Sequence, residues 1–193
     1  GQVLAIFGQP GVGKSRLTHE FLEQPDCTSF AVHAGRCASS TMATPYHPWL
    51  ELMRAMFRLE DVNGANKLID AIREHDVAAR HIPLLLSMFS LTHPDFPMPS
   101  EVARQERPQM IRDAIVSVIR AFAAHRPQII WLEDWHWADA ASNQCMRELL
   151  RVVAGIPVLV IVTARPGTSL EWPIKDNITT LTLRPLDRKA TGA

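Results

Sequence analysis

The fold is decided by residues 3–18, which read Val-Leu-Ala-Ile-Phe-Gly-Gln-Pro-Gly-Val-Gly-Lys-Ser-Arg-Leu-Thr. The apolar run 3–7 is long enough for one buried strand. Residues 8–15 then read G-x-x-x-x-G-K-S, which is the phosphate-binding P-loop pattern. Three apolar side chains follow on one face at helical spacing: Leu17, Phe21 and Leu22. The motif therefore lies between a predicted strand and a predicted helix, as its mechanism requires.

The P-loop pattern predicts a site for a triphosphate, whose oxygens carry negative charge and only accept hydrogen bonds. A sharply turning loop presents successive backbone N–H groups, and the helix N-terminus adds a partial positive charge. Glycine allows the unusual backbone angles of such a loop. Lys14 is placed to reach the β- and γ-phosphates, and the Ser15 hydroxyl to ligate Mg²⁺. The predicted nucleotide contacts are Gly8, Pro10, Gly11, Val12, Gly13, Lys14, Ser15 and Arg16.

Length and composition limit the class of protein. The 193 residues are enough for one domain, or for one domain and part of another. Hydrophobic residues make up 47% and charged residues 21%, which is typical of a soluble globular core. The net charge is zero, so it gives no sign of binding to nucleic acid or to an anionic membrane. We see no membrane-spanning apolar run and no signal sequence, and therefore expect a cytoplasmic protein.

The cysteines and the hydrophobic pattern complete the outline. Cys27, Cys37 and Cys145 form neither a C-x-x-C pair nor a zinc pattern, so we expect reduced thiols. Further strands are predicted at 29–34 (ended by Gly35), 128–133, 157–163 and 177–183. Helices are predicted at 14–23, 48–59, 66–75, 82–91, 107–125 and 139–153, and loops at 36–46 and 92–100. Strands separated by helices predict an α/β fold with a parallel sheet and right-handed crossovers.

An acidic pair, Glu133 and Asp134, ends the predicted strand 128–133. Ligands of open α/β sheets bind at the carboxyl ends of the strands, so we expect both acids beside Lys14 and Ser15. Hydrolysis needs metal ligation and a group that orients water. We assign Ser15, Glu133 and Asp134 to the metal site. Within it, Glu133 is placed on the metal side and Asp134 on the water side. The alternative is an ordinary strand end with two solvated acids.

Thr163 and Arg165 end the next buried strand and are further candidates. The Thr163 hydroxyl could hydrogen-bond the γ-phosphate or the attacking water, and Arg165 could contact phosphate and respond to its loss. Alternatively, Thr163 caps the strand and Arg165 lies on the surface. The complete set of predicted catalytic residues is Lys14, Glu133, Asp134, Thr163 and Arg165.

Several nearby residues allow two interpretations. Asp139 is predicted to cap a helix. His136 either touches a phosphate or a metal-bound water, or packs among tryptophans. Arg36 either faces the nucleotide or is a solvated loop residue. The remaining aromatic candidates are interpreted as packing or partner surface: Trp49, Trp135 and Trp172.

Four segments together resemble the STAND-type AAA ATPase domain of signal-transduction ATPases with numerous domains. They are Phe-Gly-Gln-Pro-Gly-Val-Gly-Lys-Ser-Arg-Leu at 7–17, Pro-Tyr-His-Pro-Trp at 45–49, Trp-Leu-Glu-Asp-Trp-His-Trp-Ala-Asp-Ala-Ala-Ser at 131–142 and Val-Thr-Ala-Arg-Pro at 162–166. The most specific part is Glu-Asp-x-His-Trp-Ala-Asp at 133–139, and the similarity extends from Val3 to about Leu186. Similar domains occur in LuxR-type transcriptional regulators and bacterial class III adenylate cyclases.

The resemblance implies a three-layer P-loop NTPase fold of ASCE type, with a five-stranded parallel sheet in the order 5-1-4-3-2. It implies that 8–15 is the Walker A site, that Glu133 and Asp134 form the Walker B site, and that 163–165 is the sensor motif. It also implies a core domain at 1–186, followed at 187–193 by the start of a helical lid region. We find neither the Gly-Arg-Glu motif that precedes the P-loop in the family nor the lid, and expect an excised domain.

These observations lead us to expect a Mg²⁺-dependent switch domain that binds and hydrolyses ATP within a multidomain signalling or transcriptional regulator. The implied partners are ATP and ADP, attached DNA-binding or cyclase effector domains, and a nucleotide-dependent oligomer. We identify no arginine finger. Three alternatives stay open: a nucleotide-binding switch without significant turnover, a P-loop small-molecule kinase, and an interaction domain with a relic P-loop.

Overall fold

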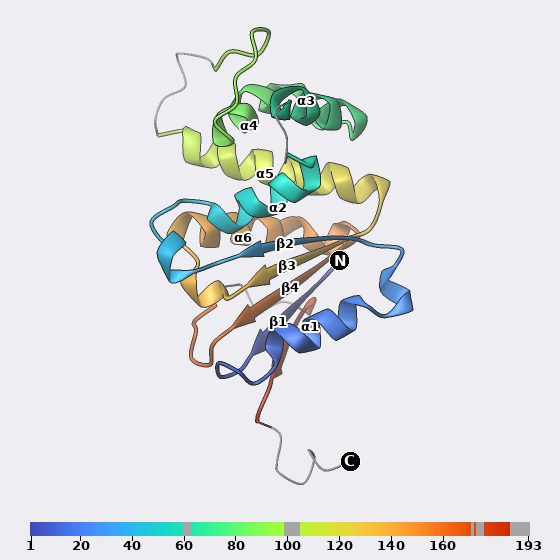
Figure 1. Ribbon diagram of the computed structural model, residues 1–193, viewed down its shortest axis with the longest axis vertical. Helices are drawn as coiled ribbons and strands as arrows, with labels where there is room; N and C mark the ends of the chain where they lie inside the picture. The colour runs from blue at the N-terminus through green and yellow to red at the C-terminus, as the bar shows by residue number, and fades with distance from the viewer. Residues whose placement is uncertain (60–62, 99–104, 171, 173–175, 186–193) are drawn as a thin grey trace.

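A five-stranded parallel sheet forms the centre of the molecule (Figure 1). The computed structural model describes residues 1–59, 63–98, 105–170, 172 and 176–185. The strands are β1 Gln2–Phe7, β2 Ala31–Arg36, β3 Gln128–Glu133, β4 Val158–Ala164 and β5 Ile178–Thr182. Their order is β2-β3-β4-β1-β5, and every pair is parallel. The predicted order 5-1-4-3-2 is the same order counted from the other edge, and it is confirmed.

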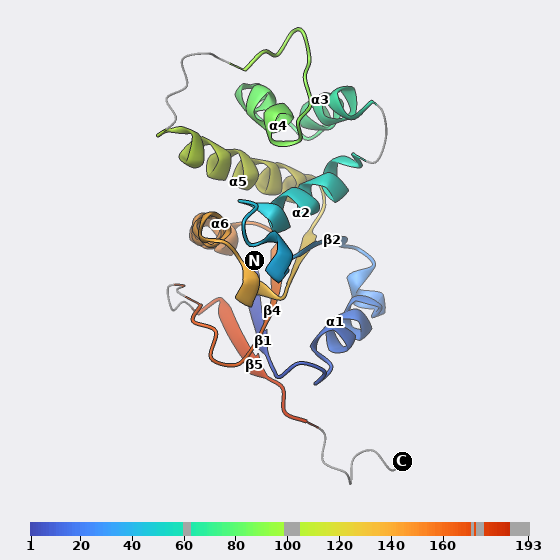
Figure 2. The ribbon, with the colours of Figure 1, turned by 60° about the vertical axis from the view of Figure 1, so that its left-hand side comes forward.

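Helices cover both faces of the sheet and give three layers (Figures 1 and 2). Helix α1 (Lys14–Leu22) lies on one face. The other face carries α2 (His47–Phe57) and α6 (Ala140–Val152), with α5 (Arg107–His125) beside α6. The short helices α3 (Gly64–Glu74) and α4 (Ile82–Met88) pack beyond α5.

Two hydrophobic clusters hold these layers together, one on each face. Side chains that alternate along the strands divide between the faces. Ile130, Leu132 and Val160 belong to the larger cluster under α2, α5 and α6. Ile129 and Trp131 belong to a smaller cluster on the α1 face. Since both faces are covered, the inner strands β1, β3 and β4 contain the near-continuous apolar runs from which they were predicted.

Helix α1 forms where it was predicted, but its apolar side chains do not make the expected face. Leu17 and Phe21 are 40% and 41% exposed, whereas Lys14 and Thr18 are buried. The Thr18 hydroxyl donates to the Lys14 carbonyl oxygen one turn earlier, at 3.1 Å. The side of the helix that faces the sheet is therefore the side that carries Lys14 and Thr18. Two apolar side chains, Leu17 and Phe21, are left on the surface.

Helix α4 ends earlier than predicted, at Met88 instead of residue 91. Ser90 adopts the left-handed conformation with φ 56°. This conformation lets the Leu91 N–H donate to the Leu86 carbonyl oxygen at 2.8 Å, an acceptor that it shares with the Phe89 N–H at 3.1 Å. Such a left-handed end satisfies the last carbonyl groups of a helix. Of the predicted loop 92–100, residues 92–98 are free of helix and strand, and 99–100 lie outside the described residues.

The second strand corrects a prediction. We expected Gly35 to end a strand at 29–34, but β2 runs from Ala31 to Arg36 and includes Gly35. The start of α2 packs so closely on β2 that a Cβ at Gly35 would clash with the Pro48 carbonyl oxygen. This glycine therefore provides a close approach and is not a strand breaker. The extension pairs Arg36 with Glu133 in the register of β2 and β3.

Gly35→Ala is expected to destabilise the fold by about 2–4 kcal/mol, because the backbone of either β2 or α2 must move. Gly155→Ala is the matched control, since a Cβ there meets nothing within 4 Å and Gly155 has no positive φ. It should stay within about 0.5 kcal/mol of wild type. Urea unfolding of the two variants measures the difference. Equal unfolding midpoints would contradict this account of the contact between β2 and α2.

Candidate functional site

The carboxyl ends of four strands bring the predicted site residues to one edge of the sheet. The P-loop follows β1, Arg36 ends β2, and Glu133 ends β3. Thr163 lies near the end of β4, and Arg165 follows that strand. Part of this group lines a pocket of about 370 Å³: Pro10, Gly11, Gly13, Lys14, Ser15, Arg16, Asp134 and Arg165. Segments more than 100 residues apart in sequence thus form one candidate site.

The P-loop has the backbone conformation that its glycines predicted. Gly11 and Gly13 have φ values of 77° and 96°, in the left-handed region that favours glycine. Gly13 is the N-cap residue of α1. The first N–H groups of a helix have no intrahelical acceptor, so those that follow Gly13 are available to an anion. The loop can therefore bind phosphate oxygens through its backbone.

Lys14 adds a buried positive charge to this loop. Its side chain is only 8% exposed. The Nζ atom donates to the carbonyl oxygens of Gly8 and Gln9, at 2.9 and 3.2 Å. An ammonium group has three donors, so Lys14 keeps one for a further acceptor. The ammonium group is thus held beside the pocket with hydrogen-bonding capacity for a phosphate oxygen.

Glu133 is engaged on both carboxylate oxygens. Oε1 accepts the Ser15 hydroxyl at 2.6 Å. Oε2 accepts Nε and Nη2 of Arg36, at 3.0 and 2.5 Å. The hydrogen bond to Glu133 is the largest cause of the raised pKa of Arg36, followed by the attraction of the same carboxylate. Burial of the Glu133 charge is therefore compensated by one hydroxyl and one guanidinium.

Asp134 has a different environment, although it is the next residue. Its backbone is left-handed, with φ 51°, and its N–H donates to Thr163 Oγ1 at 3.1 Å. Its side chain is 47% exposed, and Oδ1 lies 3.9 Å from Nδ1 of His136. The two acids thus diverge: Glu133 is buried and paired beside Ser15, whereas Asp134 opens into the pocket. This divergence agrees with the predicted division between a metal side and a water side, which stays a prediction.

Thr163→Val is expected to cost about 1–3 kcal/mol of stability, because the partly buried N–H of Asp134 loses its acceptor. Thr163 itself is 1% exposed, so water cannot easily replace the hydroxyl. Thr163→Ser keeps the acceptor and should retain most of that stability. Thermal unfolding of both variants is the measurement. If valine is tolerated as well as serine, the hydroxyl does not hold Asp134 in its left-handed conformation.

His136 and Arg165 lie at the rim of the site. Neither ring nitrogen of His136 has a hydrogen-bond partner among the described residues. Burial, and secondarily the charge of Arg165, lowers the pKa of His136, which favours the neutral imidazole. The His136 ring lies 5.1 Å from the Trp137 ring, and the Arg165 guanidinium lies 5.6 Å from the centre of that ring. Trp137 therefore supports Arg165 beside the pocket.

The other residues considered from sequence cap a helix or pack in the hydrophobic core. Asp139 caps α6 as predicted, accepting the Ser142 N–H at 2.9 Å. Trp49 and Trp135 are buried, with their rings in an edge-to-face arrangement at 6.0 Å. Trp172 packs partly buried against the same core. All three cysteines are free and buried.

The residues present fit a hard divalent cation. The hydroxyl of Ser15 and the carboxylate of Glu133 are adjacent oxygen donors, which are the ligands that Mg²⁺ prefers. Among the described residues no three His, Cys, Asp or Glu side chains gather as a metal site. A P-loop site does not require such a group, because Mg²⁺ is held there by one or two protein oxygens, phosphate and water.

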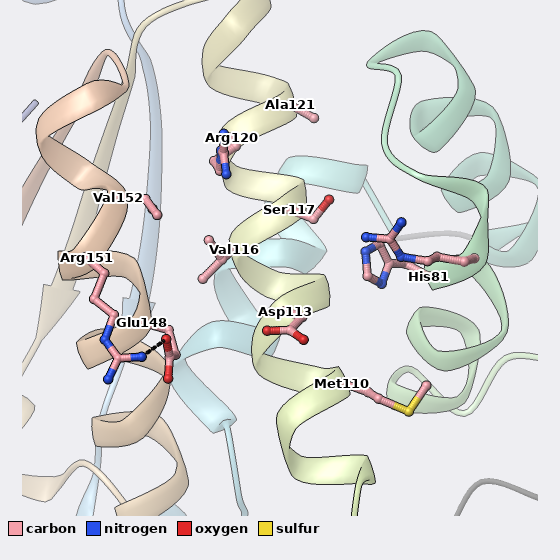
Figure 3. A pocket seen from close by; sticks show the side chains of 11 residues that line it. His81, Met110, Asp113, Val116, Ser117, Arg120, Ala121, Glu148, Arg151 and Val152 are labelled. Atoms are coloured by element: carbon pink, nitrogen blue, oxygen red, sulfur yellow. Dashed lines mark hydrogen bonds and ion pairs between the residues drawn. The ribbon is translucent and has the colours of Figure 1, made fainter.

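A larger hollow of about 720 Å³ lies elsewhere, between α5, α6 and the short helix η3 (Ala79–His81). Figure 3 shows its side chains on both sides of α5, with an ion pair between Arg151 and Glu148 on α6. It contains none of the site residues predicted from sequence.

None of the helices within the described residues combines the length and the apolar character needed to span a membrane.

Arg36 is the site residue that sequence reasoning did not select. The sequence allows a nucleotide-facing or a solvated Arg36 and does not indicate its contact with Glu133. The two residues are 97 positions apart. The available signal was positional: Arg36 follows an apolar segment, as Glu133 does. Only the pairing of β2 with β3 makes the two strand ends neighbours.

Comparison with known proteins identifies the class. Residues 1–161 match the AAA ATPase domain family, and the chain belongs to that family. The predicted resemblance to an AAA ATPase domain is thereby confirmed.

Two particular relatives are similar over nearly all of the chain. An uncharacterized protein of Rhizobium meliloti (strain 1021) is 29% identical over 196 residues, which cover 99% of this chain and 19% of that protein. The crystal structure of a Signal Transduction ATPase with Numerous Domains (STAND) protein with a tetratricopeptide repeat sensor, from Pyrococcus horikoshii, has a TM-score of 0.38 and 14% identity. That match covers 97% of this chain and 22% of the solved one. The chain thus spans about a fifth of each relative.

Proposed function

We propose that this chain is a Mg²⁺-dependent domain that binds and hydrolyses ATP. One observation carries the proposal: the P-loop residues Lys14 and Ser15 lie at the same sheet edge as Glu133 and Asp134. Membership of the AAA ATPase domain family supports it. The nucleotide would lie along the loop residues predicted from sequence, Gly8 and Pro10 to Arg16.

Each side chain has a role in the proposed reaction, in which water attacks the γ-phosphate in line. The P-loop amides and Lys14 would hold the phosphates and stabilise the charge that develops on their oxygens. Ser15 and Glu133 would hold Mg²⁺, which neutralises phosphate charge when bound. Asp134, whose carboxylate is half-exposed in the pocket, would accept a hydrogen bond from the attacking water and orient it.

Two residues of β4 and its end would complete the proposed site. Arg165 would contact the γ-phosphate and respond to its loss, since it shares the pocket with Lys14. Thr163 would act indirectly, because its buried hydroxyl holds the backbone of Asp134. It is therefore a positioning residue in this proposal and not a group that touches phosphate.

The biological role that we propose is that of a switch in a STAND-type regulator. ATP and ADP would hold neighbouring domains differently, because contacts to the γ-phosphate are lost on hydrolysis. The relatives are several times longer than this chain, which leaves room for attached effector domains such as DNA-binding or cyclase domains. A nucleotide-dependent oligomer and a cytoplasmic location belong to the same proposal.

A second candidate is a switch that binds nucleotide with little turnover. It is favoured by one contact, the Arg36 guanidinium on Glu133, because a carboxylate that is already paired with a cation is less available to a metal.

Phosphate release from ATP by the full chain, with Mg²⁺ and with EDTA, tests the proposal. We expect release that depends on Mg²⁺. Tight ATP binding without phosphate release would favour the second candidate. Transfer of the γ-phosphate to a small acceptor in place of water would indicate a kinase. An absence of nucleotide binding would contradict both switch proposals.

A further inference from the structure

The geometry points to Arg36 as a competitor of Mg²⁺: its guanidinium holds the carboxylate of Glu133 that the metal requires. This inference rests on the proposed function and concerns the regulation of the same site. It gives Arg36 the role of a positioning residue that sets how much Mg²⁺ is needed for tight nucleotide binding.

Both carboxylate oxygens of Glu133 already accept hydrogen bonds from protein groups. Arg36 donates two hydrogen bonds to Oε2, at 3.0 and 2.5 Å, while Ser15 donates its hydroxyl proton to Oε1 at 2.6 Å. The two protein groups proposed for the metal are therefore bonded to each other and to a cation. For Mg²⁺ to use them, the Ser15 hydroxyl must rotate and the Arg36 contact must weaken.

Several negative charges surround the Arg36 guanidinium. The pKa of Arg36 is raised mainly by its hydrogen bond to Glu133, with smaller contributions from Asp134 and Glu51. Arg36 thus lies in the field of three carboxylates, which is the kind of field that attracts a divalent cation. The guanidinium and Mg²⁺ are attracted to the same place, and the charge of each disfavours the other.

The side chains of Arg36 and Glu133 differ in how far they are buried. The Arg36 side chain is 67% exposed, whereas that of Glu133 is 9% exposed. The backbone of Arg36 is fixed independently, because its N–H donates to Glu51 Oε2 at 2.7 Å. The guanidinium can therefore move into solvent without displacing β2, while Glu133 stays beside Ser15. Release of Arg36 is the step that gives the metal access.

The test measures the Mg²⁺ concentration that gives half-maximal tight binding of a fluorescent ATP analogue to the full chain. Arg36→Ala is expected to lower this concentration about 5- to 10-fold. This is less than a fully buried charge-assisted contact would give, because the Arg36 side chain is exposed and water screens its charge. Arg36→Gln keeps most of the side-chain volume and should behave similarly. Arg120→Ala is the matched control, because it removes the same charge from α5, away from the P-loop pocket.

A second comparison separates competition from a merely structural role. In a Glu133→Gln background, Arg36→Ala should lower the Mg²⁺ midpoint much less than it does in the wild-type background, because the carboxylate that both cations contact is gone and only the repulsion between their charges remains. A midpoint in Arg36→Ala that equals or exceeds that of wild type overturns the inference, since Arg36 would then orient Glu133 for the metal. If the wild-type chain binds no analogue at any Mg²⁺ concentration, the proposed function itself fails.

Discussion

Lys14→Ala is expected to lower the affinity for ATP about 10- to 100-fold, which is the range of one or two charge-assisted hydrogen bonds to phosphate. The reason is the position of the ammonium group, which is buried beside the pocket and keeps a donor for a further acceptor. The backbone N–H groups of the P-loop remain in the variant, so weak binding should persist.

The measurement is a titration with a fluorescent ATP analogue in excess Mg²⁺. Because Lys14 also satisfies the carbonyl groups of Gly8 and Gln9, alanine alone could weaken the loop. Lys14→Gln is the second variant, since its amide offers N–H donors on a side chain of similar length but carries no charge, and it should lose nearly as much affinity. An affinity equal to that of wild type in both variants would mean that the nucleotide does not bind at this loop.

Asp134→Asn is expected to reduce phosphate release about 100-fold or more, the typical contribution of a group that accepts a proton from or orients the reacting water. ATP affinity should change little, because the proposed partner of the half-exposed Asp134 carboxylate is the attacking water and not the nucleotide. Asparagine keeps the shape of the side chain and the backbone N–H that Thr163 accepts. The fold and the left-handed turn should therefore survive.

Single-turnover phosphate release, measured after ATP binding is saturated, separates chemistry from affinity. Glu133→Gln provides the contrast within the same acidic pair. Its main effect should be a higher Mg²⁺ requirement, because Glu133 lies beside Ser15 and not in the open pocket. Equal release by wild type and Asp134→Asn would remove Asp134 from the reaction and favour a switch without turnover.

Much of the fold could be predicted because the three inner strands, β1, β3 and β4, are mostly buried on both faces. Such strands appear as apolar runs, and the P-loop pattern fixes which run comes first. Gly35 shows where this reasoning stops. Glycine usually interrupts a strand, and only the approach of α2 reveals why it belongs inside β2. The end of α4 differs from its predicted position for a related reason, since the sequence does not indicate that Ser90 adopts a positive φ.

The candidate site could be predicted where its residues belong to short motifs. Lys14 and Ser15 are fixed by the P-loop, and Glu133 and Asp134 by an apolar strand that ends in acids. The roles within these pairs could not be predicted, because they depend on the turn at Asp134 and on the partners of Glu133. Arg36 belongs to no short motif, and it enters the site through the pairing of β2 and β3. Contacts between distant strand ends are thus the part that the sequence does not reveal.

A calorimetric titration of the wild-type chain with ATP, in Mg²⁺ and again in EDTA, tests the central claim most directly. If the P-loop, Glu133 and Asp134 form one nucleotide site, binding should saturate at one ATP per chain and be weaker in EDTA, and ADP should compete. The absence of saturable binding at millimolar ATP, or equal affinity with and without Mg²⁺, would contradict the account.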